Sequence, residues 1–196
     1  MDKNKIKQLV EDNRIQEALV ECAKLDLPAE LKNVLGTKKN DYRNYKIDKI
    51  DNIKSFSELD RNRRLIVKGM LDLLDEYDII QTNTLGDEFS ELANVLDSKL
   101  KNENASVVQE NASVIQEVKD ISAELKAISS DNKKDLHPTF ISRIGEYIKK
   151  FQDKDSKEGK ALSVVKNGVD IVQNIGKKYN SIAQWFALPQ IPNVFL

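Results

Sequence analysis

Few residues of this 196-residue chain are of a type that performs catalysis. There is one histidine, His137, and one cysteine, Cys22. A cysteine nucleophile needs a neighbouring base, and no sequence pattern brings these two residues together. Cys22 falls on the apolar stripe of an amphipathic segment, which favours a buried structural thiol over a nucleophile.

Phosphate and metal sites are also not indicated. The segment "IGKKYNS" contains Gly-Lys but lacks the rest of a phosphate-binding loop. The alternating acids of "DKDSKEG" are interrupted by lysines, and no glutamate follows where a calcium loop requires one. A single cysteine allows neither an internal disulfide nor a cysteine-based metal site. We therefore expect no catalytic residues, no metal site and no cofactor, and we interpret the protein as a non-enzyme.

The composition predicts a helical protein with enough apolar material for a core. Hydrophobic residues make up 40% of the chain and charged residues 32%, with only 7 Gly and 4 Pro. Turn-rich β proteins use more of the last two. The sequence has neither an apolar run of signal-peptide length at its start nor one long enough to span a membrane. These features, with the single cysteine, predict a cytoplasmic location.

Charge is unevenly distributed along the chain, although the net charge is only -1. Residues 81–135 hold 6 basic and 11 acidic side chains, and residues 136–196 hold 9 basic and 5 acidic ones. Either these segments face each other in one bundle, or the basic end binds nucleic acid. We do not expect nucleic-acid binding, because the basic excess is a weak field for phosphates.

The first 80 residues predict a small helical domain. Apolar residues recur at three- and four-residue steps on both sides of Asp12-Asn13, which indicates two short helices. Pro28 suits the first turn of a third helix, "AELKNVLG", which Gly36 is expected to end. We expect Ser57 to cap a fourth helix, whose buried stripe would consist of Leu65, Ile66, Gly69, Met70, Leu73 and Leu74.

The order "IKQLVEDNRIQEAL", "AELKNVL", "DYRNY" and "SFSELDRNRRLIVKGMLDLLDE" resembles the effector-associated domain, type eleven, of bacterial conflict systems. The resemblance covers residues 1–80, and its most specific part is Ser55-Phe56-x-Glu58 followed by Arg61-Asn62-Arg63. It implies an adaptor, similar in role to death-fold adaptors, that brings an effector to a sensor or protease in antiviral defence. The implied partner is a protease, NTPase or other effector with a matching helical domain, and self-association is also implied as possible.

Three residues at the start of the fourth helix are candidate partner-binding residues: Arg61, Asn62 and Arg64. Both arginines are expected on the exposed side of the helix, where they would face acidic residues of a partner. The alternative is local pairing with Glu58 or Asp60, which contributes little to stability when exposed. Asn62 has an alternative structural role through its side-chain amide.

The remaining residues complete an all-α prediction: the N-terminal domain is followed by a long helix and a C-terminal helical bundle, residues 89–196. The polar segment "QTNTLGDE", residues 81–88, is predicted to be a hinge. No Pro or Gly interrupts the helical pattern that follows, which predicts one long helix over 89–130. Two more amphipathic helices are expected after Pro138, and Pro189 and Pro192 predict an extended tail, 189–196.

Residues 103–130 repeat in sevens, as ENASVVQ, ENASVIQ, EVKDISA and ELKAISS. Apolar residues and two asparagines alternate at three- and four-residue steps, as in a coiled-coil seam. The seam has two interpretations: the spine of an intramolecular antiparallel bundle, or a coiled coil between chains that multiplies the adaptor domain. Its candidate oligomerisation residues are Val107, Asn111, Val114, Val118, Ile121 and Leu125.

The C-terminal end, "SIAQWFALPQIPNVFL", contains the candidate partner contacts Trp185, Phe186 and Phe195. Aromatic anchors beside a proline-constrained segment lose little entropy on docking. The alternative is that the tail folds back and completes the core of the bundle. A different function, perturbation of a bilayer by "ALSVVKNGVDIVQNIGKKYNSIAQWF", would use the amphipathic character of that segment, although Asp170 lies on its polar face.

Overall fold

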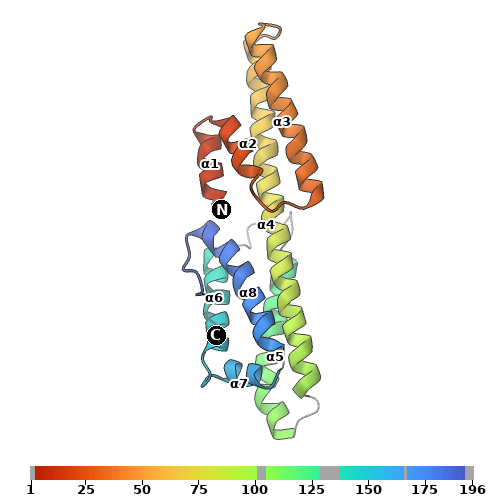
Figure 1. Cartoon of the computed structure of the whole chain (residues 1–196), viewed down its shortest axis with the longest axis vertical. Coiled ribbons are helices and arrows are strands. Elements are labelled where there is room, and N and C mark those ends of the chain that lie inside the picture. Colours follow the sequence, from red (N-terminus) through yellow and green to blue (C-terminus); the bar gives the residue numbers. More distant parts are fainter. Residues whose placement is uncertain (1–2, 101–104, 129–136, 166, 193–196) are drawn as a thin grey trace. The chain divides into compact units, whose positions relative to one another are not determined.

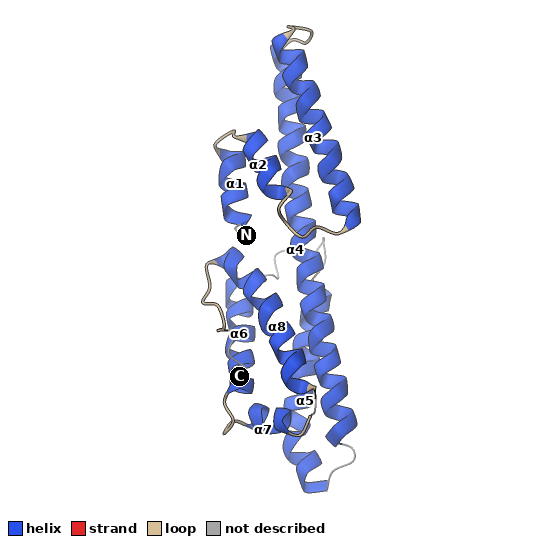
Figure 2. Ribbon diagram, in the orientation of Figure 1, coloured by secondary structure: helices blue, strands red, loops and turns tan. Residues whose placement is uncertain are grey.

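The computed structural model describes residues 3–100, 105–128, 137–165 and 167–192, with the backbone alone at 100, 105–108, 110 and 185. These residues form eight α-helices and a short 3₁₀ segment and contain no strand (Figures 1 and 2). The predicted all-α fold is therefore confirmed. Contacts within the chain divide it into two units, residues 1–78 and 79–196. None of the described helices combines the length and the apolar character that crossing a membrane requires.

The first unit begins with two short antiparallel helices, α1 (Lys3–Glu11) and α2 (Ile15–Cys22), as predicted. Asn13 separates them with a left-handed φ of 60°, which asparagine tolerates better than most residues. The apolar faces of both helices are buried, and the side chain of Lys3 is buried beside Asp78, with which it forms an ion pair. The pair joins the start of α1 to the last residue of the first unit.

Helix α3 (Ala29–Ile50) starts directly after Pro28, as predicted, but it does not end at Gly36. A glycine ends a helix by adopting a left-handed conformation, and no glycine of the described residues has a positive φ. The added part of α3 lies along the next helix, where the Lys38 side chain covers Gly69 so closely that a Cβ there would meet it at 2.7 Å. Tertiary contact therefore extends the helix beyond its local stop signal.

Helix α4 (Phe56–Leu100) includes residues 81–88, which corrects the predicted hinge. Thr82 and Leu85 are fully buried, and the Thr84 hydroxyl donates a hydrogen bond to the Ile80 carbonyl at 2.7 Å. Thr82 thus faces the core, and Thr84 forms a hydrogen bond with the backbone of its own helix. Gly86 is a site of close packing: a Cβ there would lie 3.2 Å from Leu125 Cβ.

The single helix predicted over 89–130 is wrong, because α4 ends at Leu100 and α5 spans Ala105–Ala127. The Ser90 and Ser122 hydroxyls lie 2.7 Å apart. In one straight helix they would be separated by about 48 Å, at 1.5 Å per residue. Helices α4 and α5 are therefore antiparallel, and folding back buries their apolar stripes against each other.

Helix α6 (Pro138–Gln152) is capped by His137, whose Nδ1 accepts a hydrogen bond from the Thr139 N–H at 3.3 Å. Ser156 caps the next helix, α7 (Lys157–Ser163), by accepting a hydrogen bond from the Gly159 N–H at 2.8 Å. Helix α8 (Gly168–Ala183) follows separately, and a 3₁₀ segment covers Gln184–Phe186. The described residues after Pro138 therefore form three helices, α6, α7 and α8, where two were expected, and α7 packs against α5, α6 and α8.

Candidate functional site

The residues with catalytic potential have structural roles. Cys22 is fully buried, and burial raises the pKa of its thiol to about 12, so that it stays protonated at neutral pH. His137 is occupied as the cap of α6. Within the described ranges, no cluster of three or more His, Cys, Asp or Glu side chains could hold a metal ion.

The Ser-Phe-x-Glu turn forms a reciprocal cap at the start of α4. The Ser55 N–H donates to Glu58 Oε2 at 2.9 Å, and the Ser55 hydroxyl donates to the same oxygen at 2.6 Å. The Glu58 N–H in turn donates to Ser55 Oγ at 3.4 Å. This is a capping box, and it corrects the prediction that Ser57 caps the helix. The serine and glutamate of the motif thus start the helix, while Phe56 between them is 87% exposed.

The predicted partner-binding residues on α4 differ in their surroundings. Arg64 Nε donates to Asp60 Oδ2 at 2.9 Å, which is the local pairing considered as the alternative. Arg63 pairs with the other oxygen of Asp60 at 3.0 Å. Arg61 is exposed and forms no ion pair with any described residue, and Asn62 is half-buried beside α3. Both candidate arginines are exposed, and they differ in that Arg64 is paired with Asp60.

Exposed apolar side chains are concentrated in the first unit. Of nine large, exposed apolar side chains in the described part of the chain, seven lie within residues 1–78. Leu65, predicted as part of the buried stripe of α4, is 54% exposed, because the buried face follows the steps from Ile66 to Met70 and Leu73. Scattered apolar residues are normal on a protein surface, whereas neighbouring ones mark contact sites. The seven are Val20, Val34, Ile47, Ile50, Ile53, Phe56 and Leu65.

Several of these residues line a groove between α2 and α3, here called the α2–α3 groove. Its apolar part includes Leu19 and Val20 from α2 and Ile47 from α3. Its basic part consists of Lys39, Arg43 and Lys46, which recur at four- and three-residue steps on one face of α3. The full lining is Gln16, Leu19, Val20, Lys39, Tyr42, Arg43, Lys46, Ile47 and Ile50.

Sequence reasoning missed this groove, because it is formed by two helices that the pattern treats separately. A signal was present in α3, where Lys39, Arg43 and Lys46 share one face with Tyr42 and Ile50 beside them. A helix that alternates basic and apolar residues along an exposed face indicates a contact surface.

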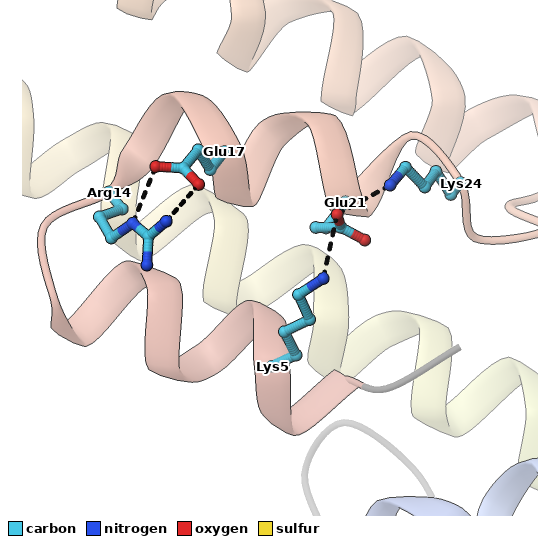
Figure 3. A network of polar contacts seen from close by, with 5 residues as sticks. All are labelled: Lys5, Arg14, Glu17, Glu21 and Lys24. Atoms are coloured by element: carbon cyan, nitrogen blue, oxygen red, sulfur yellow. Dashed lines mark hydrogen bonds and ion pairs between the residues drawn. The ribbon is translucent and has the colours of Figure 1, made fainter.

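The two acidic residues of α2, Glu17 and Glu21, are paired with nearby cations (Figure 3). Arg14 Nε donates to Glu17 at 2.8 Å, and Glu21 accepts from Lys24 at 2.8 Å and from Lys5 at 3.3 Å. Hydrogen bonds from Arg14 and Lys24 lower the pKa of the Glu17 and Glu21 carboxyls. These acids already have cationic partners within the unit.

The candidate contacts at the C-terminal end are only partly described. Phe186 is half-buried, Trp185 belongs to the 3₁₀ segment with its side chain outside the described atoms, and Phe195 lies outside the described residues. Ile191 is buried, and its backbone forms two hydrogen bonds with the Asn180 side chain, at 2.8 Å and 2.7 Å. The chain up to Pro192 thus folds back on α8, which favours the second interpretation of this segment.

Four of the six seam residues are buried inside the second unit: Val114, Val118, Ile121 and Leu125. Asn111 is half-buried, and the side chain of Val107 lies outside the described atoms. The Tyr147 hydroxyl from α6 donates to the Val114 carbonyl at 3.3 Å, within the same bundle. This burial favours the intramolecular interpretation of the heptads.

The arrangement in residues 1–78 defines a small, all-helical module with exposed apolar side chains and an apolar groove with a basic edge. This segment matches the family model Effector-associated domain 11 over residues 1–78, which confirms the predicted resemblance for the first unit. Such a domain implies protein–protein interaction in general. Residues 79–196 match no family model, and comparisons with curated proteins and with solved structures gave no match.

Proposed function

We propose that the protein is a non-enzymatic adaptor of a bacterial antiviral or conflict system, which recruits an effector by pairing residues 1–78 with a matching helical domain. The family match over residues 1–78 is the observation that carries this proposal. The exposed apolar side chains of the unit support it, because helix-mediated contacts bury such residues. Charged residues around them would select the partner through complementary charge.

We propose that the first unit recruits the effector and that residues 79–196 have a cargo or sensing role. The second unit supports such a role as a stable helical bundle, with apolar interior faces on α4, α5, α6 and α8. We also propose a cytoplasmic location, for which the protonated, buried Cys22 thiol is suited.

No observation favours the alternative of a membrane-active effector. The apolar face of α8 would have to contact lipid, but Ile171, Val172 and Ile175 are buried in the bundle. An interfacial helix needs such a face to be accessible. The adaptor is therefore the one function that we propose.

The test uses the full-length chain and a purified protein that carries a matching effector-associated domain and is encoded by a neighbouring gene. Isothermal titration calorimetry should show a stoichiometric complex. The double variant Arg61→Glu/Arg64→Glu should weaken binding at least tenfold, because it reverses two charges at the start of α4, with circular dichroism unchanged. Undiminished binding of this variant would reject the arginine surface, and no binding of the wild type to any such protein would reject the function.

A further inference from the structure

We propose that the α2–α3 groove holds one helix of the partner's matching domain, an amphipathic helix with carboxylates along the edge that lies against α3. This inference rests on the proposed function and adds the site and the chemistry of the partner. The occupant is thus a helix with an apolar stripe bordered by Asp or Glu, supplied by another protein.

The shape and the apolar lining of the groove suit a helix. Leu19 is 4% exposed at its base, while Val20 is 52% and Ile47 44% exposed along its sides. The groove runs between two helices, and a third helix packs into such a space by placing its ridge of side chains between theirs. Helix-in-groove contacts of this kind use apolar anchors three and four residues apart.

One side of the second half of α3 lies along α4, but the side that faces the groove is not covered within the unit. The buried residues of α3 are Leu31 and Leu35, and no residue between Gly36 and Ile50 is buried. Most of the stability of a protein helix comes from tertiary packing of one face. A partner helix in the groove would cover the exposed side of this half of α3.

The charges of the groove select an acidic partner. Lys39, Arg43 and Lys46 form no ion pair with any described residue, although neighbouring Lys38 pairs with Asp41 at 3.0 Å. Like charges at this spacing repel each other on a helix surface. Carboxylates of a bound helix would offset the repulsion and fix the orientation of the helix.

Nucleic acid is the other polyanion that a basic surface attracts, but this groove favours a protein. Three cations beside an apolar lining give little phosphate affinity. The exposed valine and isoleucines have no counterpart on a phosphate backbone.

The experiment measures binding of the same purified partner to two charge-reversal variants of the full-length chain. The groove variant is Lys39→Glu/Arg43→Glu/Lys46→Glu. The matched control is Lys119→Glu/Lys160→Glu/Lys177→Glu, three exposed lysines of the second unit that form no ion pair with described residues and change the net charge equally. We expect at least a hundredfold loss for the groove variant, less than a threefold change for the control, and weaker wild-type binding as salt rises.

Two further variants make the result independent of the folding of the triple variant. Val20→Asp places one carboxylate in the apolar part of the groove at an exposed position and should weaken binding at least tenfold. A photo-crosslinking residue at position 20 should link to an amphipathic partner peptide that contains Asp or Glu, while the same residue at position 169, an exposed position of the second unit, should not.

The outcomes separate the groove from the function. Wild-type binding that both the groove variant and Val20→Asp retain would overturn the groove proposal and leave the adaptor function standing. Equal weakening by the control triple would also overturn it, as would crosslinks at position 20 to a second copy of this chain or retention of the wild type on DNA or RNA through these cations. Absence of wild-type binding would instead reject the function itself.

Discussion

The Ser-Phe-x-Glu motif has both a structural part and a surface part. Ser55 and Glu58 cap helix α4, whereas Phe56 lies on the surface. The serine and glutamate bond to each other's backbone N–H groups, while the phenylalanine between them is 87% exposed. The polar residues of the motif are thus explained by the start of α4. Phe56 has no such explanation within the unit, and it remains available for a contact.

Replacing Ser55 by alanine should lower the free energy of unfolding by about 1 kcal/mol, because an N-cap side chain is lost. Ser57→Ala is the matched control, since the cap is at Ser55 and not at Ser57. Urea denaturation followed by circular dichroism measures both. Equal losses for the two serines would contradict the capping box.

The charge of Glu58 should make its contribution to stability depend on pH. The hydrogen bond from the Ser55 hydroxyl, followed by that from the Ser55 N–H, lowers the pKa of Glu58 below its ordinary value of 4.5. A carboxylate with a lowered pKa stabilises the folded state above its ordinary pKa, and this stabilisation is lost as the pH falls through the folded-state pKa.

Glu58→Gln should therefore be less stable than the wild type at pH 7, and the difference should shrink as the pH is lowered below 4.5. Thermal unfolding at a series of pH values gives the comparison. The same difference at pH 7 and at about pH 3 would show that the carboxylate charge does not contribute.

At the scale of elements, two glycines on packed helices should respond oppositely to alanine. A Cβ at Gly145 on α6 would lie 2.2 Å from the hydroxyl oxygen of Tyr179 on α8, a ring that is 2% exposed and has little room to move. Gly145→Ala should cost about 1–3 kcal/mol through overpacking.

Gly176 on α8 provides the control, because a Cβ there has no neighbour within 4 Å. Gly176→Ala should be neutral or stabilising by up to about 1 kcal/mol, since alanine favours the helix. Differential scanning calorimetry of both variants tests the packing of α6 on α8. A Gly145→Ala variant as stable as Gly176→Ala would contradict it.

The boundaries of the helices were predictable where a local signal decides them. Asp12-Asn13 separates α1 from α2, and Pro28 precedes α3, because both signals act on their own backbone. Gly36 was misleading, since a glycine ends a helix only when it turns left-handed. The 89–130 segment was mispredicted because heptad spacing says which face is apolar, but not which helix covers it.

The candidate site, like the helix boundaries, was predictable only where residues of one segment decide the outcome. The sequence predicted the family of residues 1–78 and the exposure of Arg61, both of which follow from one segment. The α2–α3 groove requires Val20 and Ile47 to be brought together by the turn between their helices. That proximity is a tertiary property, so no pattern within one helix reveals it.

At the scale of the whole molecule, the two units present different surfaces. Residues 1–78 carry seven of the nine large, exposed apolar side chains of the described residues, and the second unit carries only Val164 and Val169. The second unit buries its apolar residues, including four of the six heptad-seam positions. This contrast supports assigning the partner contact to the first unit.

The most direct test titrates the full-length chain with its partner and with the same partner lacking only its effector-associated domain. We expect a complex with the intact partner and at least a hundredfold weaker binding, or none, when that domain is removed. Unchanged affinity without the partner's domain would contradict pairing between matching domains.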